Sequence, residues 1–142
     1  MKFMLIMRVT DEAIEASKEV PFEQIIEDMG RYNEELMKAG VMVGGEGLAD
    51  PDDNGFVVDY SAEPPLVTDG PYGETKELFN GFWMLEVATK EEAIHWASKV
   101  PLGPGTKIEV RRVTDESDFD PENEWVKKEA GWREEQAARA QK

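Results

Sequence analysis

The feature that most constrains the fold is a pair of short segments in which nearly every residue is apolar. Residues 2–9 read KFMLIMRV, and residues 82–88 read FWMLEVA. A strand with one face in water alternates polar and apolar residues, whereas a strand covered on both faces is apolar at successive positions. The apolar centre of the first segment is too short for a membrane helix or for a secretory signal. Both segments are therefore predicted to be central strands of a buried sheet.

Two segments with helical spacing lie between the predicted strands. Apolar residues repeat every three or four positions through residues 22–37, with Pro21 suited to the first position of the helix and Gly40 to its left-handed stop. The sequence TKEE at 89–92 fits a capping box and predicts a second helix closed by Pro101. Its core side is predicted to consist of Ala93, Ile94, Ala97 and Val100. Residues 10–20 are polar without a clear period and are predicted to form a loop that could include a helical turn.

Shorter strand patterns complete the predicted plan. They lie at residues 41–43, 56–60, 64–69 and 105–113. Glycines at 44, 45 and 47 interrupt the first of them, as at a bulge or a close approach of two backbones. Two helices among at least four strands predict an α+β fold of the ferredoxin-like split β-α-β kind. Because the helices of such a sheet cover one face, a second copy of the chain is the simplest cover for the other.

The end of the chain differs in composition from the rest. We expect a folded domain over residues 1–113 and a charged extension over 114–142. Asp120 and Pro121 predict a polar helix over 121–140 that carries two tryptophans on one face. Such a polar helix should dock through these tryptophans or else fray.

Charge and composition exclude several function classes. The chain of 142 residues carries 31 acidic and 16 basic residues, a net charge of −15, and such a charge repels nucleic acids and anionic membranes. The chain has no cysteine, which rules out disulfides, thiol nucleophiles and cysteine-bound metals and is compatible with a cytoplasmic location. We predict no metal and no cofactor. A partial calcium-loop pattern at 50–61 lacks the glutamate at its twelfth position and is typical of a hairpin loop.

The segment from Asp69 to Gly81 is longer than a hairpin turn requires, and long ordered loops in compact domains often carry function. Asp69 is the first candidate for chemistry. A carboxylate fixed at a strand end can act as a general base if burial raises its pKa. An aspartate before glycine also commonly caps its own turn, and this structural interpretation stays open.

Other polar residues admit two interpretations as well. Glu46, between two glycines, is the second candidate, either as an acid that reaches into a pocket or as a solvent-facing residue at a bulge. Thr75 and Lys76 either bind the carboxylate or phosphate of a ligand or hold their loop by capping and ion pairing. His95 is predicted to be a surface residue of the second helix. Trp83 is predicted to belong to the core.

The stretch DGPYGETKELFNGFW at 69–83 resembles the signature of the YCII-related family, in the branch named after its Asp-Gly-Pro-Phe motif. Tyr72 stands where phenylalanine is usual, and residues 33–48 and 91–101 also resemble that branch. The resemblance implies a dimeric α+β barrel, in which two ferredoxin-like sheets close on each other. It implies no settled activity. Genes of the branch often lie beside extracytoplasmic-function sigma factors, which implies a regulatory connection.

One expectation from the family fails in this sequence. A His–Asp pair has been suggested as catalytic in the wider family, but its histidine would fall on Met29, and Val100 stands where cysteine or histidine is frequent. One hypothesis is a dimer that binds an unknown small molecule, with cofactor-free proton transfer through Asp69 and Glu46. The alternatives are a non-catalytic regulator in a sigma-factor pathway and a bare structural dimer. The sequence leaves open whether the protein is an enzyme.

Overall fold

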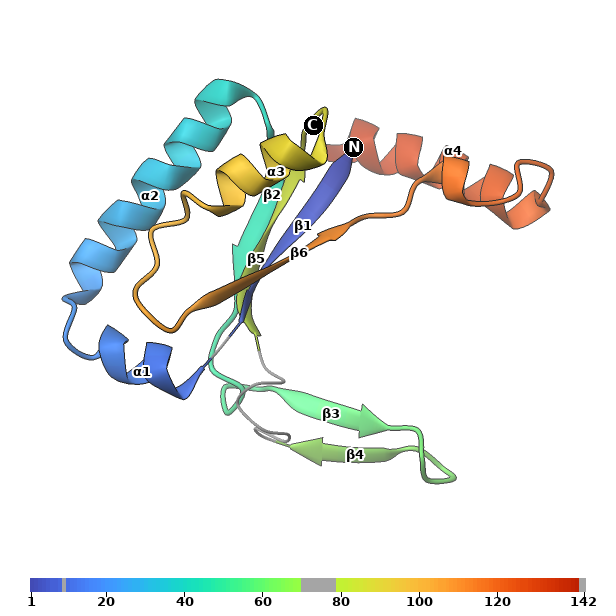
Figure 1. The fold of residues 1–142 in the computed structure, drawn as a ribbon. Coiled ribbons are helices and arrows are strands. Elements are labelled where there is room, and N and C mark those ends of the chain that lie inside the picture. The colour runs from blue at the N-terminus through green and yellow to red at the C-terminus, as the bar shows by residue number, and fades with distance from the viewer. Residues whose placement is uncertain (9, 70–78, 141–142) are drawn as a thin grey trace. The chain divides into compact units, whose positions relative to one another are not determined.

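The computed structural model describes residues 1–8, 10–69 and 79–140, and the chain divides into two compact units, Met1–Arg112 and Val113–Lys142. In its described residues, the first unit contains a four-stranded sheet, a two-stranded hairpin and three helices (Figure 1). Along the chain these elements are β1 (Lys2–Arg8), α1 (Asp11–Ser17), α2 (Phe22–Ala39), β2 (Met42–Gly47), β3 (Phe56–Asp59), β4 (Leu66–Asp69), β5 (Phe79–Glu86), α3 (Lys90–Ala97) and β6 (Lys107–Arg112).

The sheet has the strand order β2-β5-β1-β6, and every neighbouring pair is antiparallel. The connection through α2 carries the chain from β1 past β5 to β2, and the connection through α3 carries it from β5 past β1 to β6. This is the split β-α-β arrangement, so the predicted ferredoxin-like α+β fold is confirmed. The two apolar segments of the sequence form the central strands β1 and β5, as predicted. The β3–β4 hairpin is an insertion between β2 and β5.

Alternate residues of the central strands build the core on the face that α2 and α3 cover (Figure 1). The core consists of buried apolar residues from the sheet, the helices and their ends: Phe3, Leu5, Tyr32, Leu36, Val41, Trp83, Leu85, Val87 and Ala93. The residues in between point to the opposite face, where Met4 and Ile6 of β1 pair with Met84 and Phe82 of β5 and remain partly exposed. Both faces of the sheet are therefore apolar at their centre.

The helix α2 follows its prediction closely, with one difference in its buried face. It begins one residue after Pro21 and ends at Gly40, whose left-handed backbone (φ 72°) lets its N–H donate to the carbonyl groups of the last turn. Tyr32 and Leu36 are buried, but other members of the predicted apolar stripe are exposed: Phe22, Ile26 and Met37. The stripe in the sequence is thus wider than the face that the sheet covers.

Three local predictions are corrected by the structure. Residues 11–17, predicted as a loop, form the helix α1, because the Thr10 hydroxyl accepts a hydrogen bond from the Ala13 N–H and caps the first turn. The helix α3 ends at Ala97, before Pro101, and Ile94 is 52% exposed although it was predicted to face the core. The strand β2 continues through its glycines, with a bulge between Met42 and Gly44.

The predicted capping box of α3 is half formed. The Thr89 hydroxyl accepts from the Glu92 N–H at 3.1 Å, as predicted, but the Glu92 carboxylate accepts from the Ala88 N–H at 2.9 Å and not from that of Thr89.

The strand patterns at 56–60 and 64–69 form a hairpin, in which β3 and β4 pair antiparallel from Phe56 opposite Asp69 to Asp59 opposite Leu66. The loop after residue 50, predicted as a hairpin loop, instead connects two different sheets.

The second unit contains a short 3₁₀ turn (Glu116–Asp118) and the helix α4 (Glu124–Ala140). The Asn123 side chain caps α4 by accepting from the Trp125 N–H at 2.9 Å, so the helix does not begin at Pro121 as predicted. Trp125 and Trp132 are 64% and 50% exposed, and the docking of this helix stays a prediction. Among the helices in the described part of the chain, none is both long and apolar enough to cross a bilayer.

Candidate functional site

A cleft of about 260 Å³ opens between α2 and the strands β1, β2 and β5. The side chains that line it are mostly apolar, with few polar groups. Three thioether side chains contribute, from Met7 of β1, Met29 of α2 and Met42 of β2. The polar side chain is the amide of Asn33 on α2. Glu46 on β2 contributes main chain, because it lies opposite Phe82 on the face of the sheet away from α2. Because Met29 and Asn33 are four residues apart on one helix, they share a face of α2.

Glycines form the wall of the cleft where β2 meets β5. A Cβ atom on Gly45 would lie 2.9 Å from the carbonyl oxygen of Phe82, and one on Gly81 would lie 2.8 Å from the carbonyl oxygen of Glu46. Neither distance leaves room for a methyl group. The predicted close approach of two backbones is therefore present, and this wall of the cleft is main chain without side chains.

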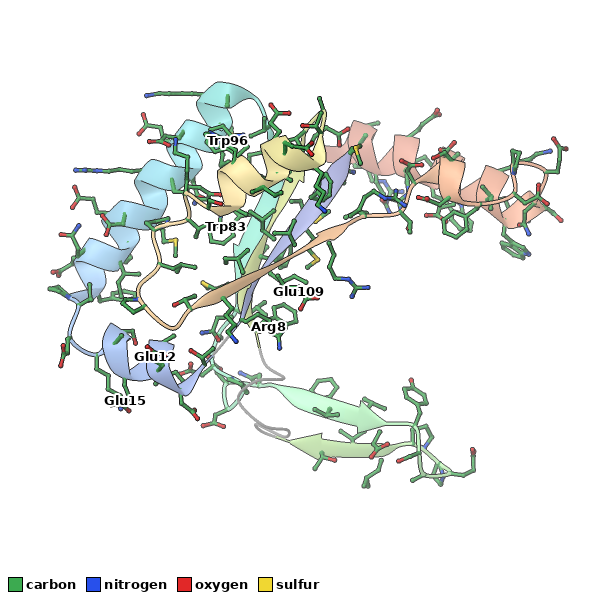
Figure 2. The ribbon with its side chains drawn as sticks, in the orientation of Figure 1. Arg8, Glu12, Glu15, Trp83, Trp96 and Glu109 are labelled. Atoms are coloured by element: carbon green, nitrogen blue, oxygen red, sulfur yellow. The ribbon has the colours of Figure 1, made fainter. Side chains whose placement is uncertain are left out.

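A hydrogen-bonded aromatic cluster lies beside the cleft on the helix side of the sheet, where Figure 2 shows Trp83 and Trp96. The indole N–H of Trp83 donates to the side-chain oxygen of Asn33 at 2.8 Å. The ring of Trp83 meets the ring of Tyr32 edge to face, with centroids 5.5 Å apart. The Tyr32 hydroxyl in turn donates to the carbonyl of Trp96 at 2.9 Å. These contacts join α2 to β5 and to α3.

The environment of Tyr32 keeps its hydroxyl neutral. Burial raises the pKa of Tyr32 to about 12, and the nearby carboxylate of Glu35 adds to this shift. At neutral pH the phenol is therefore protonated and can donate its hydrogen bond to the Trp96 carbonyl.

The predicted site residues have different outcomes. Glu46 is exposed and lies opposite Phe82, so its side chain is on the face of the sheet away from α2 and only its main chain lines the cleft. Asp69 is the last residue of β4, opposite Phe56, and its side chain lies outside the described residues. Thr75 and Lys76 also lie outside them. Their predicted roles stay predictions.

Two other predictions are confirmed. His95 is exposed on α3, with its ring 5.2 Å from that of Trp96, and is a surface residue. Trp83 is 7% exposed and belongs to the core, although one side of it also lines the cleft. Met29, where the histidine of the family was expected, lines the cleft as well, so a thioether occupies that place.

Sequence reasoning missed Asn33. The available signal was a polar amide in the middle of an apolar helical stripe, next to Tyr32 and four residues after Met29. A polar residue on the buried side of a helix must find a hydrogen-bond partner, and its partner here comes from a strand 50 residues away.

The arrangement suits recognition of an apolar molecule with few polar groups. Thioethers are polarizable and adapt to irregular or aromatic shapes, while the amide of Asn33 supplies a directed contact. Within residues 1–8, 10–69 and 79–140, no three histidine, cysteine, aspartate or glutamate side chains are placed to hold a metal ion.

Comparison with known proteins gives one clear family match. Residues 1–117 match the family described as the YCII-related domain. An uncharacterised protein of Rhizobium meliloti (strain 1021) is 29% identical over 75 residues, which are 53% of this chain and 60% of that protein. A solved structure of 5-chloro-2-hydroxyhydroquinone dehydrochlorinase from Burkholderia phenoliruptrix AC1100, in complex with 2,5-dihydroxybenzoquinone, is similar with a TM-score of 0.42 and 14% identity. The likeness covers 84% of this chain and 100% of that one.

Proposed function

Because the chain belongs to the YCII-related family, which it matches over residues 1–117, we propose that it is a small-molecule-binding protein whose site is the cleft beside α2. The construction of the cleft supports this function. Sites for small molecules are mostly apolar, with a few placed polar groups and volumes of roughly 300–1,000 Å³. At about 260 Å³ the cleft lies just below that range and suits a small ligand. By its DGPYGETKE motif we assign the chain to the Asp-Gly-Pro-Phe branch of the family.

Proton transfer without a cofactor is the chemistry that these groups would support. A positioned carboxylate that accepts a proton accelerates a reaction by about 10²–10⁴-fold. Asp69, at the end of β4, is the first carboxylate that we propose for this role. Glu46 is the second, although its place opposite Phe82 puts its side chain on the face of the sheet away from α2 and leaves its main chain at the cleft. A ligand with an acidic C–H or O–H group is the substrate that this proposal requires.

The proposal includes a homodimer. Met4, Ile6, Phe82 and Met84 make the face of the sheet opposite the helices apolar, and a second copy of the chain would cover it. At one end of this face lies an ion pair between Arg8 and Glu109, both labelled in Figure 2, with nitrogen and oxygen 2.8 Å apart. An apolar centre with charged residues at its rim is the usual composition of a protein interface.

One observation favours a second function, a non-catalytic sensor in a sigma-factor pathway. Met29 lines the cleft where the family histidine was expected, so the cleft has a thioether in place of an imidazole that could transfer protons. Binding alone needs no such group. An extracytoplasmic-function sigma factor encoded beside this protein would support the sensor, and a catabolic operon would support the enzyme.

Methionine labelling tests the proposed site directly. The chain has seven methionines, and ¹³C-methyl labels report ligand contact at each of them. With a panel of small neutral fragments we expect the methyl signals of Met7, Met29 and Met42 to shift, because these side chains line the cleft. The signals of Met37 and Met84, which lie elsewhere, are the internal controls. Shifts confined to Met84, or no shifts with any fragment, would contradict the cleft as the binding site.

A further inference from the structure

We propose that Asn33 determines the ligand specificity of the cleft: its side-chain NH₂ group, oriented by Trp83, selects neutral molecules that carry a carbonyl-type acceptor oxygen. The inference rests on the proposed function and adds to it the chemical class of the ligand. Three observations support it. Trp83 fixes the orientation of the Asn33 amide, the amide nitrogen has no protein acceptor among the described residues, and the rest of the cleft lining is mostly apolar.

Trp83 fixes which end of the Asn33 amide is available. An indole N–H is a donor only, so the atom 2.8 Å from it must be the acceptor of the amide, the oxygen Oδ1. Rotation of the amide by 180° would place NH₂ against N–H and lose this bond. The indole itself is held in place, because Trp83 is buried and its ring packs edge to face on Tyr32. The NH₂ group must therefore point away from Trp83.

The nitrogen Nδ2 of Asn33 is free to bind a ligand. The structure shows no protein acceptor for it among the residues it describes. In the same residues, no buried side-chain nitrogen or oxygen lacks a partner, so an unpartnered Nδ2 has to be accessible. Asn33 is half-buried and lines the cleft. The accessible surface of its NH₂ group is thus the surface that a ligand in the cleft would meet.

The rest of the lining excludes anions and favours an apolar body. The sulfur atoms of Met7, Met29 and Met42 are weak acceptors on apolar stems, and they make favourable contacts with aromatic rings. The net charge of −15 opposes the entry of a carboxylate or phosphate into the cleft. A neutral aromatic carbonyl compound would accept a hydrogen bond from the Asn33 NH₂ group and pack its ring against the thioethers. Being neutral, it would not be repelled by the negative charge of the protein.

Two probes of the same shape test the role of the acceptor. Acetophenone and ethylbenzene share a ring with a two-carbon side chain and differ in the carbonyl oxygen. With the full chain, we expect acetophenone to bind about three- to tenfold more tightly, which is the effect of one neutral hydrogen bond. In ¹H–¹⁵N NMR spectra acetophenone should shift the side-chain NH₂ signals of Asn33, and ethylbenzene should leave them in place.

Three variants separate the roles of the two residues. Asn33→Asp keeps an acceptor for Trp83 and removes the donor, so the preference for acetophenone over ethylbenzene should disappear. Trp83→Phe removes the indole N–H, frees the amide to rotate and should reduce the preference. Gln24→Glu makes the same amide-to-acid change at an exposed position of α2 away from the cleft and should change neither affinity.

The outcomes distinguish this inference from the proposed function. If both probes shift the cleft methionines but bind equally, and Asn33→Asp changes nothing, the assignment of Asn33 is wrong and the binding site stands. If neither probe shifts Met7, Met29 or Met42, the proposed function is wrong and the inference falls with it. Should Asn33→Asp fail to fold, the NH₂ signals of the unmodified protein decide, since acetophenone must shift them if Asn33 is the donor.

Discussion

Replacement of Gly81 by alanine should destabilise the protein through a single misplaced methyl group. The new Cβ atom would lie 2.8 Å from the carbonyl oxygen of Glu46 and 3.3 Å from the Cα atom of Gly47. Both atoms belong to the backbone of β2, so the clash cannot be relieved by rotation of a side chain. The strand β2 has to move away from β5, and that movement lengthens their hydrogen bonds and deforms the wall of the cleft.

The size of this effect follows from two opposing terms. Forcing an extra methyl group into a packed site costs about 1–3 kcal/mol. Alanine also lowers the conformational entropy of the unfolded chain relative to glycine, which stabilises the folded state by about 0.4–1 kcal/mol. We expect a net loss of about 1–2 kcal/mol in the free energy of unfolding, and a fall of roughly 3–10 °C in the melting temperature for a domain of this size.

Gly44→Ala is the matched control for Gly81→Ala. A Cβ atom on Gly44 would meet no heavy atom within 4 Å, so this variant should be as stable as the unmodified protein or slightly more stable. Urea unfolding followed by tryptophan fluorescence compares the two variants, since the buried Trp83 reports on the core. Equal urea midpoints for Gly81→Ala and Gly44→Ala would refute the close approach of β2 and β5 as the reason for glycine at position 81.

Two further predictions concern assembly and pH. Light scattering across a dilution series should give twice 16.0 kDa, because the apolar face around Ile6 and Met84 needs a cover, and a stable 16.0 kDa monomer at micromolar concentration would contradict the proposed dimer. The folded pKa of Tyr32, about 12, lies above its ordinary value of 10.0, so the unfolded chain loses this proton first. The contribution of the buried, neutral Tyr32 hydroxyl to the free energy of unfolding is complete below pH 10 and is lost as the pH rises to 12. The urea midpoint should fall less steeply over that range in Tyr32→Phe, and identical slopes would contradict the role of its burial.

Much of the fold could be predicted from the sequence because burial on both faces leaves a compositional mark. The successive apolar residues of β1 and β5 placed these strands at the centre of the sheet. The helix α1 left no such mark, since none of its residues is buried and the Thr10 side chain caps its start. The strand β2 was underestimated because glycine disfavours strands in general, whereas at Gly45 only glycine allows the pairing with β5.

The candidate site could be predicted in part. The glycines around residue 45 were recognisable as a close approach of two backbones, and they form one wall of the cleft. One interpretation of the sequence had the side chain of Glu46 reach into a pocket, but its place opposite Phe82 puts it on the other face of the sheet. Asn33 was not recognisable, because its role comes from a hydrogen bond to Trp83, and a contact across 50 residues has no local pattern. Local patterns report which faces are buried. They do not report which polar groups meet after the sheet and helices have packed.

The position of β1 between β5 and β6 affects how the chain can fold during its synthesis. The strand Lys2–Arg8 is made first, yet its first partner, β5, begins at Phe79, and its second, β6, begins at Lys107. At a synthesis rate of about 5–20 residues per second, the N-terminal strand waits roughly 4–14 seconds for its first neighbour. During this interval an apolar segment with β-strand character is exposed and unpaired. A chain whose translation stops before Lys107 would keep one edge of β1 open, which is the condition under which strands recruit other chains and aggregate.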